Sequence, residues 1–264
     1  MSGKLVNVAD NQPDEDFEEC WVLSGNHFLK QVDKGQLKVF RTTLLSPIIE
    51  HHVFRLGNQL FIVFIKDVQE RLTSPSSWER FIEYSATMNA IPCVVEMRKS
   101  MLGGWQFVNR RWGLTHAMTG KEVYPPELVT HEKIEMSDWE VQDFAIQVLM
   151  HGLEKNGYEI TSHHSYPEIK PSVWLIDPDG QLCYLVISVV RYPQTEAPIP
   201  DGIAEVVEAN KNLSEFGYYL SISVANSNEA FDPDAEIGMK LYRGDGLMVS
   251  ANDPVEIQTI MRKH

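Results

Sequence analysis

The most regular alternation of apolar and polar positions predicts a helix from about Ser137 to Asn156. Ser137 and Glu140 have the spacing of a capping box, which satisfies free backbone N–H groups at a helix start. Apolar residues then recur at helical spacing, at Val141, Phe144, Ala145, Val148, Leu149 and Gly152. Gly157 follows and favours the left-handed conformation that ends a helix.

Apolar runs after this helix predict three strands, over 158–164, 173–176 and 182–190. Residues 177–180, Asp-Pro-Asp-Gly, are typical of a turn, so we expect the last two strands to form a hairpin.

A second helix is predicted beyond the Pro-rich link 192–200, with Asp201 as its cap and Gly217 at its end. Its expected inward residues are Ile203, Val206, Val207 and Leu213. A buried strand over 218–224 follows, and the helix between two strands allows them to run parallel through a crossover.

The N-terminal half shows the same order of elements. Strands are predicted over 48–56 and 59–67 around the turn Gly57-Asn58, then a helix with a capping box at Ser76 and Glu79, then a strand over 91–97. The expected inward residues of that helix are Trp78, Phe81, Ile82 and Met88. We therefore predict an α/β fold with mixed sheets and two lobes, each with a strand hairpin, a crossover helix and a further strand, and an internal duplication as a hypothesis.

Residues 171–192 read PSVWLIDPDGQLCYLVISVVRY, a hairpin opened by proline and closed by an apolar strand. In its setting of helix, strands, helix and strand, this hairpin resembles the PD-(D/E)XK, or restriction-endonuclease-like, nuclease family. The resemblance implies an acid on the first strand and an acid and a lysine on the second, which hold magnesium and poise water for phosphodiester cleavage. The first acid falls at Ser172 and the acid and lysine fall at Val186 and Ser188, and neither a serine hydroxyl nor a valine can replace an ionised carboxylate. We expect a degenerate nuclease-like lobe.

Aligned in the same way, the first half places Glu50 opposite Ser172, and Phe64 and Lys66 opposite Val186 and Ser188. The middle carboxylate is missing there too, so Glu50 and Lys66 are interpreted as surface residues. No catalytic residue, metal ligand or cofactor is predicted.

The domain organisation predicted from these patterns has four segments. They are an acidic N-terminal arm over 1–20, an α/β lobe over 21–100, a basic aromatic connector over 101–136, and the degenerate nuclease-like lobe over 137–264.

Composition limits the functional classes. A net charge of −14 and a pI near 5.0 disfavour a nucleic acid partner. The chain begins without the apolar run of a signal peptide, and no apolar stretch approaches the roughly 18 residues of a membrane span, so we expect a cytoplasmic location without membrane association. Cys20, Cys93 and Cys183 are far apart and are expected to be core thiols.

The stretch from Arg98 to Lys121 contains five basic residues and no acidic one, with aromatic residues between them. Because arginine and tryptophan are enriched at binding hot spots, we predict a contact surface for a protein partner. Its residues are Arg98, Lys99, Trp105, Arg110, Arg111 and Trp112. In the alternative interpretation, the tryptophans cover the joint between the lobes and the basic groups pair internally, for example with the acidic run Asp14–Glu19.

Other chemical signals are weak. The sequence has no GxSxG, Walker A or GxGxxG motif. Adjacent histidines, at 51–52 and 163–164, lie on predicted strands, so the rings of each pair point to opposite faces and cannot share a metal ion. Residues 232–236 are interpreted as an acidic turn, and residues 243–246 as the turn of a hairpin between strands over 239–242 and 247–250.

Two functional classes remain. We favour a non-catalytic interaction or adaptor protein on a degenerate nuclease-like fold. The alternative is a metal-dependent nuclease whose ligands have moved, for example to Glu154, Glu168, Asp177, Glu205 or Glu208. Three carboxylate or lysine groups within about 4 to 5 Å of one another in a cleft would favour the nuclease.

Overall fold

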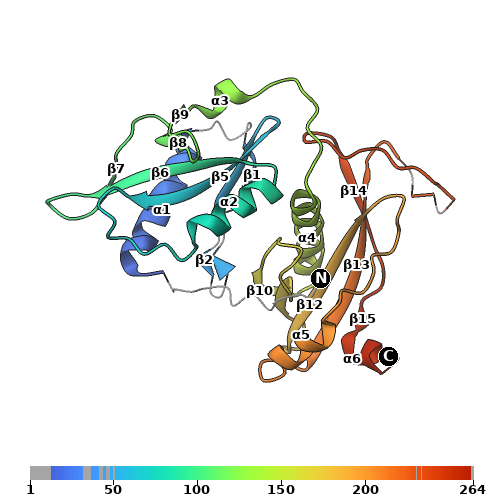
Figure 1. Ribbon diagram of the computed structural model, residues 1–264. Helices are drawn as coiled ribbons and strands as arrows, with labels where there is room; N and C mark the ends of the chain where they lie inside the picture. Colours follow the sequence, from blue (N-terminus) through green and yellow to red (C-terminus); the bar gives the residue numbers. More distant parts are fainter. Residues whose placement is uncertain are drawn as a thin grey trace. The chain divides into compact units, whose positions relative to one another are not determined.

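The structure is a computed structural model, and it describes residues 13–31, 37–41, 44–45, 48–49, 51–229, 231–232 and 234–262. These residues divide into two compact units, the first ending at Ile134 and the second beginning at Glu135. Each unit is built on a sheet with both parallel and antiparallel strand pairs (Figure 1). The predicted α/β class with two mixed sheets is therefore confirmed.

The N-terminal unit has one main sheet in the order β1-β4-β5-β6-β8-β9, with β7 paired to the end of β6 and a small separate pair, β2-β3. Its elements are α1 (Glu15–Gln31), β1 (Leu37–Arg41), β2 (Leu44–Leu45), β3 (Ile48–Ile49), β4 (His52–Leu56), β5 (Gln59–Asp67), α2 (Trp78–Thr87), β6 (Ile91–Lys99), β7 (Trp105–Phe107), β8 (Leu114–His116), β9 (Glu122–Val123) and α3 (Pro125–Leu128).

The predicted hairpin, crossover helix and strand of this unit are present. Strands β4 and β5 are antiparallel around Gly57, which has a φ of 57°, and α2 leads to β6, which runs parallel to β5. The predicted strand over 48–56 is divided into β3 and β4. The cap of α2 is Ser77 and not Ser76, because the Ser77 hydroxyl accepts the hydrogen bond from the Arg80 N–H at 3.2 Å.

Two segments expected to lie outside this lobe are built into it. Residues 1–12 of the predicted acidic arm lie outside the described residues, but α1 begins at Glu15 and buries Phe17, Cys20 and Trp21 in the core. This spacing, i, i+3 and i+4, is that of an amphipathic helix. The segment 101–136, expected as a connector, contributes β7, β8 and β9 to the sheet.

The C-terminal unit has a sheet in the order β10-β11-β12-β13-β14, and β15 also pairs with β13. Its elements are α4 (Asp138–Lys155), β10 (Glu159–His163), β11 (Val173–Ile176), β12 (Leu182–Arg191), α5 (Ile203–Asn210), β13 (Phe216–Asn226), β14 (Leu247–Ala251), β15 (Val255–Glu256) and α6 (Ile257–Met261).

Helix α4 forms as predicted, with a complete capping box between Ser137 and Glu140 and a left-handed Gly157 after its end. Its residues Ala145 and Ile146 pack in one core with β11, β12 and β13. Val148, predicted to face the core, is exposed instead.

The crossover between β12 and β13 is also confirmed, because these strands pair in parallel over nine residues of register. Helix α5 is shorter than predicted. It begins after Gly202, whose φ of 80° makes it the cap in place of Asp201, and it ends at Asn210. Leu213 is exposed, and Gly217 lies within β13, where a larger side chain would collide with the Tyr184 ring.

The other face of this sheet is covered by α5 and α6, which lie side by side at one end of β12 and β13 (Figure 1). The predicted terminal hairpin does not form. Residues 247–251 form β14, but residues 239–242 form no strand, and Tyr242 makes only an isolated bridge to Glu135.

No helix in the described part of the chain is long and apolar enough to cross a membrane. Cys20, Cys93 and Cys183 are free and buried, as predicted.

Candidate functional site

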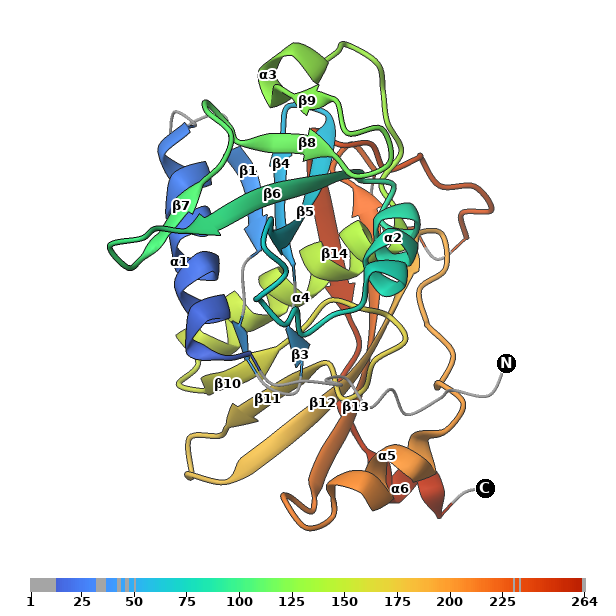
Figure 2. The ribbon, with the colours of Figure 1, turned by 60° about the vertical axis from the view of Figure 1, so that its left-hand side comes forward.

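The basic segment begins in the hairpin formed by β6 and β7, which projects beyond its sheet (Figure 1, Figure 2). The antiparallel register places Lys99 opposite Trp105 and Arg98 opposite Gln106. Because neighbouring strand residues point to opposite faces, Lys99 and Trp105 share one face. Arg98 and Gln106 share the other face and are exposed.

Asp16 on α1 binds both residues of the first pair. Its carboxylate accepts hydrogen bonds from the Lys99 ammonium at 2.7 Å and from the Trp105 indole N–H at 3.0 Å. These two donors hold the pKa of Asp16 below its usual value. The Lys99 ammonium also lies 5.6 Å from the centre of the Trp105 ring. The base of the hairpin is therefore fixed to α1.

Burial corrects part of the predicted contact surface. Trp105 and Trp112 are only 6% and 3% exposed and belong to the core of the N-terminal unit, where Trp112 stacks on Phe54. Burial in this core stabilises the fold, because both rings have a large apolar surface that is removed from water. Lys99 forms an ion pair with Asp16. This contact agrees with the alternative interpretation, in which basic groups of the segment pair with the acidic run Asp14–Glu19.

The five-residue turn of this hairpin, residues 100–104, has a defined conformation. The Ser100 N–H donates to the Gly104 carbonyl at 2.9 Å, and the Leu102 N–H donates to the Ser100 hydroxyl at 3.3 Å. Gly103 and Gly104 have φ values of 88° and 77°, a region that favours glycine. The turn is thus held by backbone hydrogen bonds and by the Ser100 hydroxyl.

Sequence reasoning missed the two residues that this turn presents. Met101 is 104% exposed and Leu102 is 99% exposed. The sequence does place two large apolar residues before a Gly-Gly pair between two strands, a pattern that could have indicated an exposed apolar turn. The predicted contact surface included the neighbouring tryptophans instead. We call Met101 and Leu102, with Arg98 at the end of β6, the hairpin tip.

The remaining cations of the segment lie on the surface. Arg110 and Arg111 are exposed on a turn closed by the Gly113 N–H and the Arg110 carbonyl at 2.9 Å. Arg111 has a φ of 58° and lies 6.0 Å from the centre of the Tyr124 ring. Among the residues that the structure describes, Arg98, Arg110 and Lys121 form no salt bridge.

Of the three positions that the resemblance aligns with nuclease residues, Ser172 and Val186 are buried in the C-terminal unit, and Ser188 is half-buried. Ser172 and Val186 are inaccessible to solvent, and the Ser172 N–H donates to the Leu185 carbonyl. The ammonium of Lys170 donates to the Ile187 carbonyl and to the Ser172 hydroxyl, the latter at 3.4 Å. Burial lowers the pKa of Lys170 to about 8. A cationic side chain therefore lies beside Ser172, where the resemblance implies an acid that binds a metal ion.

The acids considered as migrated ligands are dispersed in local roles. Glu154, Glu168 and Glu205 are exposed, and Glu208 pairs with Lys211. Asp177 accepts the N–H groups of residues 179 and 181 in its own turn. Within the described ranges, no group of three or more His, Cys, Asp or Glu residues could hold a metal ion. Glu50 lies outside the described residues, and Lys66 is exposed on β5.

The histidine pairs diverge as predicted. His52 stacks on Trp21 and bonds to the Ser24 hydroxyl at 2.9 Å, whereas His51 packs on Phe81. In the second pair, His164 bonds to the Pro171 carbonyl at 2.7 Å and His163 contacts Gln147. Burial lowers the pKa of His51 and His164 to about 4 and that of His52 to about 3.

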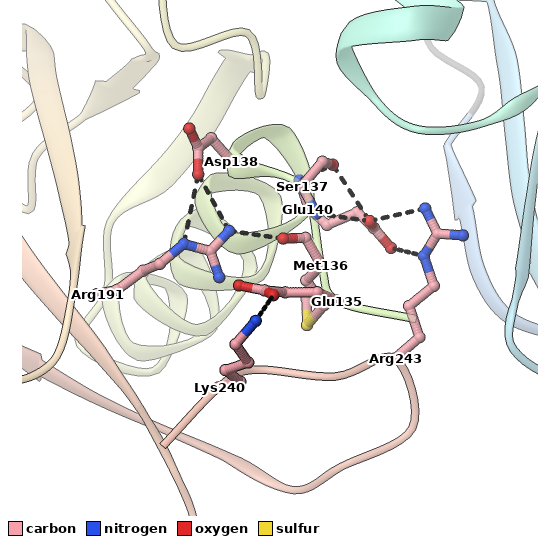
Figure 3. A network of polar contacts seen from close by, with 8 residues as sticks. All are labelled: Glu135, Met136, Ser137, Asp138, Glu140, Arg191, Lys240 and Arg243. Atoms are coloured by element: carbon pink, nitrogen blue, oxygen red, sulfur yellow. Dashed lines mark hydrogen bonds and ion pairs between the residues drawn. The ribbon is translucent and has the colours of Figure 1, made fainter. Parts of the chain in front are cut away.

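A polar network surrounds the start of α4 (Figure 3). The Glu140 carboxylate accepts the Ser137 N–H at 3.0 Å and the Nε–H of Arg243 at 2.8 Å. On either side, Arg191 pairs with Asp138 at 3.0 Å and Lys240 pairs with Glu135 at 2.8 Å. The network fixes the loop before β14 to the start of α4. Arg243 was predicted only as part of a hairpin turn, and this ion pair was not predicted.

Comparison with known proteins gives one partial match. Over residues 139–257, the chain is similar to a domain of unknown function, DUF8840. No curated protein and no solved structure matches the chain.

Proposed function

We propose that the protein is a non-catalytic interaction or adaptor protein that binds another protein through the hairpin tip. The full exposure of Met101 and Leu102 on a fixed loop carries this proposal. An apolar side chain gains about 1.5 to 3 kcal/mol when it is completely buried. Two such side chains without internal contacts are therefore suited to a pocket on a partner.

The construction of the hairpin supports this use. Asp16 holds its base, and backbone hydrogen bonds hold residues 100–104. A loop that is already ordered loses less conformational entropy on binding than a flexible one. Little of the binding free energy from the apolar contacts of the hairpin tip is therefore offset by lost conformational entropy.

The charge of Arg98 indicates the kind of partner. Arg98 is exposed at the end of β6, on the face opposite Lys99 and Trp105, whose partners Asp16 and Glu19 belong to α1. This cation favours a partner with a carboxylate beside an apolar pocket, which would raise the association rate and the specificity. Arg98 remains in the proposed surface, whereas Lys99 and Trp105 position it from within, Trp112 lies in the core, and Arg110 and Arg111 are exposed on the turn after β7.

Lys170 supports the non-catalytic part of the proposal. Its ammonium, bound by the Ile187 carbonyl, would repel a magnesium ion placed beside Ser172. At the two positions where the resemblance implies acids, the chain has Ser172 and Val186, and the ammonium of Lys170 lies beside Ser172.

The test uses full-length protein with Met101→Ser and Leu102→Ser, expressed in the native cell and purified with its bound proteins. We expect the captured partner to disappear while the melting temperature stays unchanged, because these side chains pack on nothing within the unit. The control is Met118→Ser with Ile237→Ser, two exposed apolar loop residues elsewhere, and it should retain the partner. Equal capture by both variants would contradict the proposal.

A further inference from the structure

A groove of about 440 Å³ lies on the C-terminal unit, far in sequence from the hairpin tip. The Pro-rich link before α5 forms one side, and β15 with α6 forms the other. Tyr219 and Ser221 of β13 line it between them. Its volume lies within the roughly 300 to 1,000 Å³ of typical ligand sites.

The first side of the groove is fixed by alternate residues of β13, which point to one face of the strand. The Tyr219 hydroxyl donates to the Ala197 carbonyl at 2.8 Å, and the Ser221 hydroxyl accepts the Ala197 N–H at 2.7 Å. Ser223 donates to the Gln194 carbonyl at 2.6 Å. The link therefore lies in one position across the strand, and the groove exists without a ligand.

The second side results from a break in strand pairing. Ala251 pairs with Ile222 and Val255 pairs with Tyr219, so residues 252–254 leave the ladder between β14 and β15. The Asn252 N–H still donates to the Ser221 carbonyl at 3.0 Å. This excursion brings Asp253 and Val255 to the groove.

The lining combines negative charge with exposed apolar surface. Among the described residues that line it, Glu196 and Asp253 carry the charge, and both are exposed. Ile199 and Val255 add apolar surface to the lining and are 42% and 41% exposed. The net charge of −14 adds to the attraction for a cation.

We propose that this groove binds a short peptide segment of a partner protein that carries lysine or arginine beside an apolar residue. The basic side chain pairs with Glu196 and Asp253, and the apolar one covers Ile199 and Val255. The groove goes beyond the proposed function, because it is a second site with the opposite charge preference from the hairpin tip.

The experiment selects a random dodecapeptide display library on immobilised full-length protein. We expect enrichment of peptides with Lys or Arg next to an apolar residue. The strongest peptide is then labelled, and its affinity is measured by fluorescence polarisation. We expect Glu196→Gln with Asp253→Asn to weaken binding at least about tenfold, because charge-assisted contacts are lost. Ile199→Ser with Val255→Ser should weaken it as well.

The matched control is Glu154→Gln with Asp179→Asn, which removes two exposed carboxylates of the same unit outside the groove. It should bind the peptide like the wild type, and so should the Met101→Ser, Leu102→Ser variant. Absence of enrichment, an acidic consensus, or equal binding by the groove variants would overturn the assignment. Spermine serves as the small-cation probe, and tighter binding of spermine than of the peptide would also overturn it.

Discussion

The carboxylate of Glu140 and the guanidinium of Arg243 pair through two hydrogen bonds, at 2.8 and 3.0 Å, although their side chains are only 5% and 1% exposed. Removing one partner of a buried ion pair leaves the other charge poorly compensated, which typically costs about 3 to 5 kcal/mol. We expect Glu140→Gln to lower the free energy of unfolding by about that amount in urea titrations. Glu135→Gln, which breaks the exposed pair with Lys240, should cost at most about 1 kcal/mol. Similar losses in both variants would show that burial does not strengthen the first pair.

The buried histidines predict a loss of stability in mild acid. The pKa of His51 is about 4 in the folded protein and near 6.5 in an unfolded chain, so the unfolded chain binds more protons between these values. Stability should be constant above about pH 7 and fall as the pH decreases from 6.5 towards 4, by about 1.4 kcal/mol per pH unit for each such histidine.

Urea unfolding at several pH values tests this prediction. His51→Phe keeps the ring contact with Phe81 and removes the titrating group, so its stability should depend less steeply on pH. An identical slope in this variant and the wild type would rule out His51 as a source of the acid sensitivity.

Two glycines provide a matched pair for packing. Gly217→Ala would place a methyl group against the Tyr184 ring, so we expect a loss of about 1 to 3 kcal/mol from overpacking. Gly152 on α4 has no heavy atom near its added Cβ, and Gly152→Ala should be stabilising by about 0.5 to 1 kcal/mol through helix propensity. Thermal unfolding measures both, and a stabilising Gly217→Ala would contradict the tight contact between β12 and β13.

Short-range patterns predicted much of this fold. The capping box of α4 and strands β5 and β11 appear at the predicted residues, because their signals lie within the elements themselves. The start of α5 was wrong because Gly202 adopts the cap conformation in place of the adjacent Asp201.

Long-range contacts were not predictable in the same way. Arg243 pairs with a residue 103 positions earlier, which no local pattern can indicate. The basic segment was identified, but the roles within it depend on α1, which covers Trp105 and leaves Met101 and Leu102 exposed. The acidic run at 14–19 was predicted to be an internal partner or a solvated arm, because charges dominate it; its buried residue Phe17 belongs with Cys20 and Trp21, which lie beyond the run on α1.

The non-catalytic part of the proposal predicts a negative result with divalent ions. We expect no binding of magnesium or manganese at micromolar concentrations by isothermal titration calorimetry, because Lys170 places an ammonium beside Ser172. DNA and RNA should remain intact with either ion. Cleavage that a chelator abolishes would restore the nuclease alternative.

The most direct test of the proposed function is photo-crosslinking from the hairpin tip. Leu102 is replaced by p-benzoylphenylalanine in the native cell, and Met118, another exposed apolar residue, is replaced in the control. The proposal predicts one discrete protein adduct from position 102 that Arg98→Glu weakens, and none of that mass from position 118. No adduct from position 102, or the same adducts from both positions, would contradict it.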